Sequence, residues 1–419
     1  MIERVMTQMN NTISAIKSIV GLISVCVCMA SCGTVNTEND SHFDENGYAI
    51  YNQQDSVLFT PTEPTKVKFY FEVSGSMNGF FRSNKPTGFK EDVWSVLNSC
   101  SAVSEIYVME DLKGDRPHRM EQSDFRLAMN GGSFVSTNST VVSEMLRNIT
   151  ENLDADNGEV AVFVSDMRYD PVDMKSAKVL VTQYRSDIAK MFHNFGKAAS
   201  LVCATSDFQD RAGKIVTSRA PYYFLILGNG PEVARVRNLI SAVLFNTDRF
   251  VDNIEAGFDY GRPTYSFGVP QKCYQMEDQE PTFIGYEDEE EGDTCTIKLN
   301  VNLENYRWIM TDEEHFEAAF KVKSTYGSFV KVSGIEIDKK NSKATLILKV
   351  YGMVMDSEVL EWSLELPEKE YTLMGEFFDD ATDPNDPTKS FSVKDFCEGM
   401  FGGLTNEIKP NYILISKKN

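Results

Sequence analysis

The feature that most constrains the fold is an alternation of short apolar runs with amphipathic stretches, which continues from residue 66 to residue 262. The apolar run KVKFYFEV at 66–73 is followed by a helical pattern at 91–103 and then by a second apolar run at 104–111. A strand, a helix and a further strand in this order are typical of a mainly parallel sheet.

The alternation then continues with further strands and helices. Strands are expected at 159–167, 200–208 and 222–229, and helices at 140–153, 177–199 and 231–245. Because at least five strands are apolar enough to be buried, residues 63–262 are predicted to form an open, doubly wound α/β domain of the Rossmann-like kind.

The pattern changes after residue 262. The stretch 263–293 is rich in acidic residues and is interpreted as a solvated linker, since its charges lack the spacing of a calcium-binding loop. From residue 294 apolar and polar residues alternate with a period of two, and the turn at 338–342 predicts a hairpin. Residues 294–419 are therefore predicted to form a β-sandwich-like domain, which includes a short helix at 392–401 and a last strand at 411–418.

The charge of the chain restricts its partners. With 41 basic and 62 acidic residues, the formal net charge is −21. A surface that binds nucleic acid needs clustered Lys and Arg to neutralise phosphates, so the composition excludes nucleic acid as a partner. The same charge disfavours direct attachment to anionic lipid headgroups.

The first 31 residues predict a cleavable signal peptide. Basic residues come first, an apolar run follows at 18–29, and Ala30 and Ser31 precede Cys32. The apolar run is shorter than the roughly 20 residues that cross a bilayer. Met29 to Cys32, with Gly33 after them, resemble the lipobox of Gram-negative lipoproteins. This resemblance implies that Cys32 becomes the acylated first residue, which would anchor the protein by lipid to the outer membrane, on its periplasmic face or at the cell surface.

Residues 32–62 are interpreted as a flexible tether, because their polar composition buries too little apolar surface to order itself. Five further cysteines follow the tether, and no two of them have the CxxC spacing of a metal site. A disulfide between Cys273 and Cys295 is one expectation for an oxidising compartment, and buried free thiols are the other.

One motif at the end of the first expected strand carries oxygen ligands. In FYFEVSGSMNGFF, residues 69–81, the side chains of Glu72, Ser74 and Ser76 are spaced two apart and leave an extended chain on the same side. The carboxyl end of such a strand is where doubly wound sheets bind ligands. Carboxylate and hydroxyl oxygens suit Mg²⁺, Mn²⁺ or Ca²⁺.

This string resembles the start of the metal-ion-dependent adhesion site of von Willebrand factor A (VWA) domains, Asp-x-Ser-x-Ser, with Glu72 in the place of Asp. The family completes its site with a threonine before a helix and an aspartate after a later strand. Thr137, with Thr140 as a competing choice, and Asp166 stand at these places. The resemblance covers about half of the chain and implies a protein-binding module in which a partner's carboxylate completes the coordination of the ion.

Two other functions stay open. A metal-free structural lipoprotein needs no ion, and in that case Ser74 and Ser76 satisfy local turn hydrogen bonds. A hydrolase or phosphatase with a strand-end serine needs a base, yet the only histidines lie at 42, 118, 193 and 315, in stretches that read as tether, loop and helix. The sequence therefore does not predict an enzyme. Phe80 and Phe81, which follow the motif, belong either to an exposed protein-binding surface or to the core beneath a helix.

Overall fold

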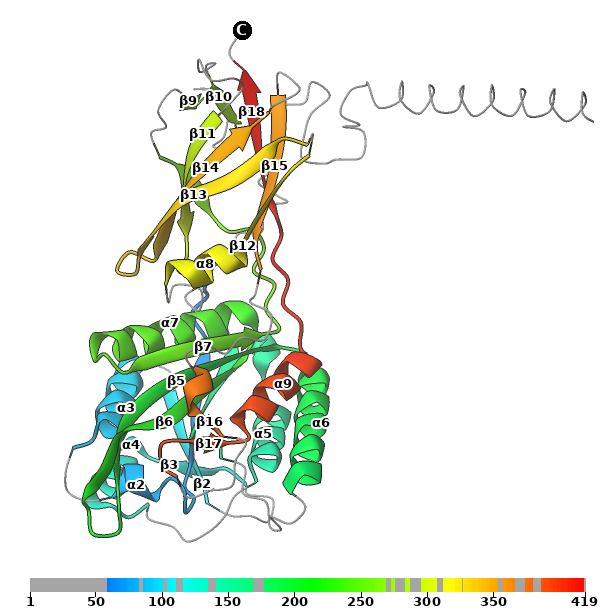
Figure 1. The fold of residues 1–419 in the computed structure, drawn as a ribbon. Coiled ribbons are helices and arrows are strands. Elements are labelled where there is room, and N and C mark those ends of the chain that lie inside the picture. Colours follow the sequence, from blue (N-terminus) through cyan, green and yellow to red (C-terminus); the bar gives the residue numbers. More distant parts are fainter. Residues whose placement is uncertain are drawn as a thin grey trace, which may run out of the picture.

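The computed structural model describes fourteen segments of the chain (Figure 1). They are residues 59–82, 86–100, 104–110, 116–134, 141–168, 177–268, 273–275, 283–286, 295–306, 312–325, 327–352, 357–365, 374–379 and 386–417. The expected signal peptide, Cys32 and most of the tether lie outside these residues.

A mixed sheet of seven strands forms the centre of the first half of the chain. Its order is β3-β2-β1-β4-β6-β5-β7. The strands are β1 Lys66–Glu72, β2 Ser104–Met109, β3 His118–Met120, β4 Glu159–Ser165, β5 Ala198–Gln209, β6 Ile215–Gly228 and β7 Phe250–Ala256. The predicted α/β class is therefore confirmed, with helices on a sheet followed by a β-rich region.

The sheet is parallel only in part. Strand β1 pairs in parallel with β2 and β4, as the strand and helix alternation predicted. Beyond β4 the pairs β4–β6, β6–β5 and β5–β7 are antiparallel. For β5 and β6 the reason is local, because Asp210 and Lys214 close a tight turn between these two strands, with Gly213 in the left-handed region at φ 75°. A turn this short joins neighbouring strands only in antiparallel fashion.

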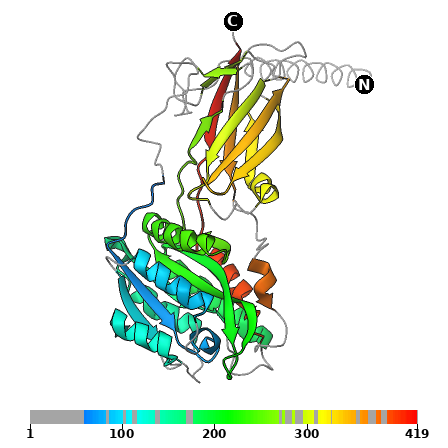
Figure 2. The ribbon, with the colours of Figure 1, turned by 90° about the vertical axis from the view of Figure 1, so that its left-hand side faces the viewer.

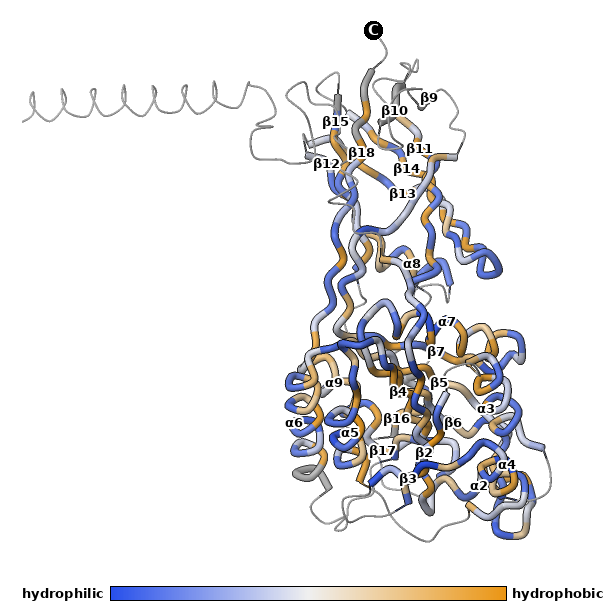
Figure 3. Tube along the Cα trace, turned by 180° about the vertical axis from the view of Figure 1, so that it is seen from behind, coloured by the Kyte–Doolittle hydropathy of each residue, from blue (hydrophilic) through white to orange (hydrophobic). Residues whose placement is uncertain are grey.

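Helices cover both faces of this sheet (Figures 1 and 2). The side chains of Phe69 and Phe71 in β1 belong to one core, and that of Tyr70 belongs to the other. One face carries α2 Asn78–Phe81, α3 Gly88–Ser99, α4 Gln122–Gly131 and α7 Gly230–Asn246; the other carries α5 Val142–Glu151, α6 Ala177–Phe195 and α9 Val393–Gly403. Figure 3 shows the apolar residues gathered along the central strands.

Two smaller sheets form the β-rich part. Their orders are β12-β15-β18-β10-β9 and β13-β14-β11-β8. The strands are β8 Tyr265–Phe267, β9 Cys273–Gln275, β10 Phe283–Tyr286, β11 Cys295–Asn302, β12 Phe320–Ser324, β13 Phe329–Asp338, β14 Lys343–Tyr351, β15 Ser357–Leu364 and β18 Asn411–Lys417, and α8 Glu313–Ala319 precedes β12. Tyr265 of the second sheet packs against Trp362 of the first, with ring centroids 5.2 Å apart.

Two features of this region bear on the sequence predictions. The predicted hairpin is confirmed, since β13 and β14 pair up to Asp338 and Lys343. The stretch 263–293, expected to be a linker, contributes β8, β9 and β10, because short apolar segments lie between its charges. The structure does not describe the side chain of Cys273, so the disulfide between Cys273 and Cys295 stays a prediction. Within the described segments, no helix is long and apolar enough to cross a membrane.

The chain returns to the α/β domain after β15. Residues 374–404, termed the C-terminal excursion, comprise the short 3₁₀ turn Met374–Phe377, the strand pair β16 Phe378–Asp379 and β17 Ser390–Phe391, and α9. Phe396 and Met400 of α9 are buried in the same core as Ile188 of α6. The expected boundary at 294 assigned this segment to the β-rich domain. Figure 1 shows instead that α9 lies beside α6, and that the chain rejoins the β-rich strands only after α9, with β18.

Candidate functional site

The turn after β1 is held from both sides. The Val73 amide donates to the Met109 carbonyl at 2.8 Å, which extends the pairing of β1 with β2 by one residue. After the turn, Phe80 and Phe81 of α2 are buried, at 1% and 0% exposure. The two phenylalanines were expected either on an exposed binding surface or in the core, and the structure shows them in the core. The residues between these anchors, Ser74 to Ser76, are therefore fixed at the end of the strand.

The two motif serines lie against each other and against the end of β4. The Ser74 and Ser76 hydroxyl oxygens are 3.0 Å apart. Ser76 also hydrogen-bonds to the carboxylate of Asp166, the residue that follows β4. Ser74 and Asp166 are buried, at 2% and 3% exposure, and Ser76 is half-buried. The structure thus brings Ser74 and Ser76 together with Asp166, which follows Ser76 by 90 positions along the chain.

Glu72 is connected to the same strand end through a residue that the sequence reasoning missed. Its carboxylate accepts a hydrogen bond from the Ser165 hydroxyl, and Glu72 is only 1% exposed. The Ser165 oxygen in turn accepts from the Met167 amide at 2.7 Å. A buried carboxylate is costly without donors, so Ser165 supports Glu72 within the core.

Burial sets the electrostatics at Asp166. It raises the pKa of this carboxyl group above its ordinary value, although the neighbouring Arg168 and the hydrogen bonds from Arg168 and Ser76 act in the opposite direction. The Arg168 Nε lies 3.7 Å from Asp166 Oδ2. The raised pKa means that desolvation outweighs the stabilisation of the charged form by Arg168 and these hydrogen bonds.

The backbone between Asp166 and Arg168 is unusual. Met167 has φ 54°, in the left-handed region that non-glycine residues rarely adopt, at a cost of about 1 kcal/mol. Its side chain is fully buried in the core, which holds this conformation in place. The resulting turn lets the Arg168 amide donate to Asp166 Oδ1 at 3.2 Å. Such local strain is characteristic of functional sites.

Arg168 also connects this site to the C-terminal excursion. Its guanidinium donates to the main-chain carbonyls of Lys389, at 2.8 Å, and Asp386. The segment that lies next to the site is therefore contributed by residues more than 200 positions later in the chain. Arg168 was another residue missed from the sequence; its only signal was a base two positions after Asp166.

The hydroxyl and carboxylate oxygens at this strand end are of the type that hard divalent cations bind. Within the described part of the chain, no three His, Cys, Asp or Glu side chains are grouped so that they could hold a metal ion. An ion here would therefore depend on the hydroxyls of Ser74 and Ser76 together with Asp166, and such oxygen ligands suit Mg²⁺, Mn²⁺ or Ca²⁺.

The other expected site residues are placed as follows. Thr137 and its competitor Thr140 lie outside the described residues. His118 and His193 are exposed on β3 and α6, and the Nδ1 atom of His315 lies 2.6 Å from Asp312 Oδ1. The hydrolase alternative therefore gains no base from these positions and stays an untested prediction.

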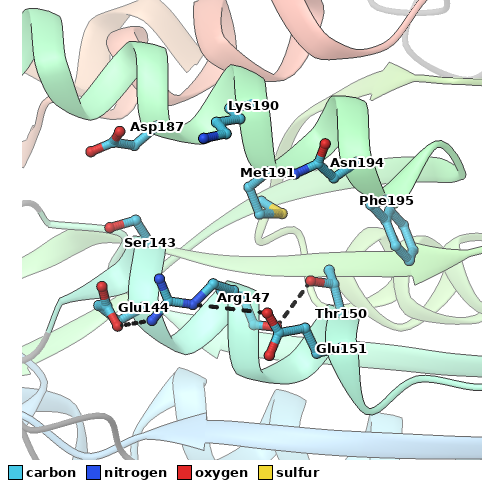
Figure 4. A pocket seen from close by; sticks show the side chains of 10 residues that line it. All are labelled: Ser143, Glu144, Arg147, Thr150, Glu151, Asp187, Lys190, Met191, Asn194 and Phe195. Atoms are coloured by element: carbon cyan, nitrogen blue, oxygen red, sulfur yellow. Dashed lines mark hydrogen bonds and ion pairs between the residues drawn. The ribbon is translucent and has the colours of Figure 1, made fainter.

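A second candidate is a groove of about 550 Å³ between α5 and α6 (Figure 4). Its most prominent cation, Arg147, pairs with Glu144 and, at 4.0 Å, with Glu151 of the same helix. These charges compensate one another within α5, so Arg147 itself is already paired with carboxylates of its own helix. The strand-end site remains the stronger candidate.

Comparisons with protein-family models, with curated proteins and with solved structures found no match to this chain.

Proposed function

We propose that this chain is a lipid-anchored protein of the bacterial cell envelope, whose α/β domain binds a protein partner through a divalent cation. The observation that carries the proposal is the contact of Ser74 with Ser76 and of Ser76 with Asp166 at one strand end. Three of the five residues that the resemblance assigns to a VWA-type adhesion site come together in this contact, and their oxygens suit a hard cation. The anchor would be Cys32, through the lipid attached to it.

In this function the chain supplies most ligands of the ion, and the partner protein completes its coordination. The hydroxyls of Ser74 and Ser76, with Thr137, would hold the ion, and Glu72 and Asp166 would act mainly through water. The bound cation supplies a position at which a carboxylate of the partner is recognised. Arg168 keeps Asp166 oriented, because the same guanidinium is fixed on the carbonyl of Lys389.

The proposal is tested by retention of envelope proteins on the immobilised full-length chain, with Mn²⁺ or with a chelator. A partner should be retained only with the ion, and the Ser74→Ala/Ser76→Ala double variant should not retain it. A matched control is Ser95→Ala, an exposed serine of α3, which should bind as the unchanged chain does. Equal retention by the double variant, or in chelator, would contradict the adhesion-type function and favour the metal-free structural role.

A further inference from the structure

A second hollow lies on the surface of the α/β domain, between α3 and α4. Its volume is about 520 Å³, which is within the range of small-molecule sites. The residues that line it are one aromatic side chain and five polar ones: Trp94, Asn98, Gln122, Ser123, Arg126 and Asn130. None of them belongs to the strand-end site.

The aromatic wall of this hollow is held in a fixed position. Trp94 is half-buried, and its ring packs against that of Phe125 with centroids 6.1 Å apart. Phe125 is fully buried and packs in turn against Phe71 of β1, at 4.5 Å. An indole held in this way loses little conformational entropy when a ligand packs against it.

The polar residues are aligned and available. Gln122, Arg126 and Asn130 are four positions apart and form one stripe along α4, and Asn98 follows Trp94 by one turn of α3. In the described segments, no hydrogen bond or ion pair engages the side chains of these four residues or of Ser123. Amide groups offer a donor and an acceptor each, which match the hydroxyls of a sugar.

The charge of Arg126 further restricts the class of ligand that this hollow would bind. Its guanidinium lies 5.7 Å from the centroid of the Trp94 ring, and among the described residues it has no carboxylate partner, in a chain of net charge −21. Arg147 in the α5–α6 groove, by contrast, is paired with two carboxylates of its own helix. A planar guanidinium binds a carboxylate through two parallel hydrogen bonds. Among the described residues, Arg126 is thus placed to pair with a carboxylate of a ligand.

We propose that this hollow binds a sugar that carries a carboxylate, namely a hexuronate unit of an acidic saccharide. The C–H groups of the pyranose ring pack against the indole of Trp94. The ring hydroxyls pair with the amides of Asn98, Gln122 and Asn130, and the carboxylate accepts from Arg126. A neutral sugar leaves Arg126 unmatched, and a simple carboxylic acid leaves the indole and the amides unused.

The test uses glucuronate, glucose and acetate as probes of the full-length chain. The chain carries the substitution Trp308→Phe, which removes one of the two other indoles. The remaining one, Trp362, is 1% exposed and out of reach of an added ligand, so that a change in fluorescence reports on Trp94. Glucuronate is expected to change this fluorescence saturably, glucose to bind at least tenfold more weakly, and acetate to have no effect. By calorimetry, Arg126→Gln should weaken glucuronate binding about tenfold, and Leu127→Ala, an exposed neighbour outside the hollow, should not.

Three results would overturn the proposal. They are absence of saturable glucuronate binding, equal affinity for glucose and glucuronate, and glucuronate binding that Arg126→Gln leaves unchanged. These outcomes are independent of the strand-end site, because Ser74→Ala/Ser76→Ala should bind glucuronate as the unchanged chain does.

Discussion

Ser165 donates a hydrogen bond to the carboxylate of Glu72, so the residue that opens the motif is held by the strand that leads to Asp166. Both side chains are buried, at 0% and 1% exposure. This pair joins two neighbouring parallel strands, β1 and β4, at the end where the candidate ligands lie.

Replacing Ser165 by Ala is expected to destabilise the protein. The change removes the donor to Glu72 and the acceptor for the Met167 amide, so the free energy of unfolding should fall by about 1–3 kcal/mol. Urea unfolding followed by circular dichroism measures this change. The exposed Ser95→Ala is the matched control, with an expected change within about 0.5 kcal/mol. An unchanged midpoint for Ser165→Ala would show that Glu72 does not depend on this bond.

Arg168→Gln should loosen the C-terminal excursion. The substitution removes the guanidinium that donates to the carbonyls of Asp386 and Lys389. Hydrogen exchange of the amides around 386–392 should become faster, while exchange in α9 itself should stay slow, because its buried face is packed on α6. The matched control is Arg147→Gln, whose charge is paired within α5. Equal exchange in both variants would contradict the role given to Arg168.

Asp92 is expected to be the most sensitive charged residue of α3. It is fully buried, and its carboxylate receives two hydrogen bonds of 2.7 Å from Arg249 and one of 2.6 Å from the Tyr222 hydroxyl. Asp92→Ala should cost about 3–5 kcal/mol of unfolding free energy, because it leaves Arg249 without its main partner. Glu91→Ala removes the more exposed partner of the same Arg249, at 3.2 Å, and should cost less than about 1 kcal/mol. Similar losses in the two variants would contradict this assignment.

Glu159 is predicted to make stability depend on pH at the acid end. Partial burial tends to raise the pKa of this carboxyl group, but hydrogen bonds from Lys68 and the Asp154 amide, together with the charges of Lys68 and Lys66, lower it below the ordinary value of 4.5. The ionised group therefore stabilises the fold above pH 4.5, and this contribution is lost as the pH falls through the lowered pKa. Unfolding of the unchanged chain and of Glu159→Gln should differ most above about pH 5 and converge in acid. A constant difference would contradict the sign.

The parts of the fold that the sequence predicted are those that depend on local pattern. The order β1, α3, β2 and the hairpin of β13 with β14 follow from periodicity and turn residues, because these specify direction within short segments. The return of α9 to the α/β domain was missed. Its apolar residues reveal that one face is buried, but not which surface covers that face.

The candidate site was predictable to a similar extent. Ser74, Ser76 and Asp166 were found because they stand at strand ends, where neighbouring strands place their ligands together. Ser165 was missed because a hydroxyl within an apolar run carries no signal of its partner. Arg168 was missed because its contacts lie more than 200 residues away along the chain.

The most direct test of the central claim is Mn²⁺ binding to the full-length chain, measured from the free-ion signal in electron paramagnetic resonance. The account predicts one saturable site that is lost in Ser74→Ala/Ser76→Ala and kept in Ser95→Ala. The double variant should remain folded by circular dichroism, because each change removes only one hydroxyl group, at buried Ser74 and at half-buried Ser76. Equal Mn²⁺ binding by the unchanged chain and the double variant, or none by either, would contradict the account.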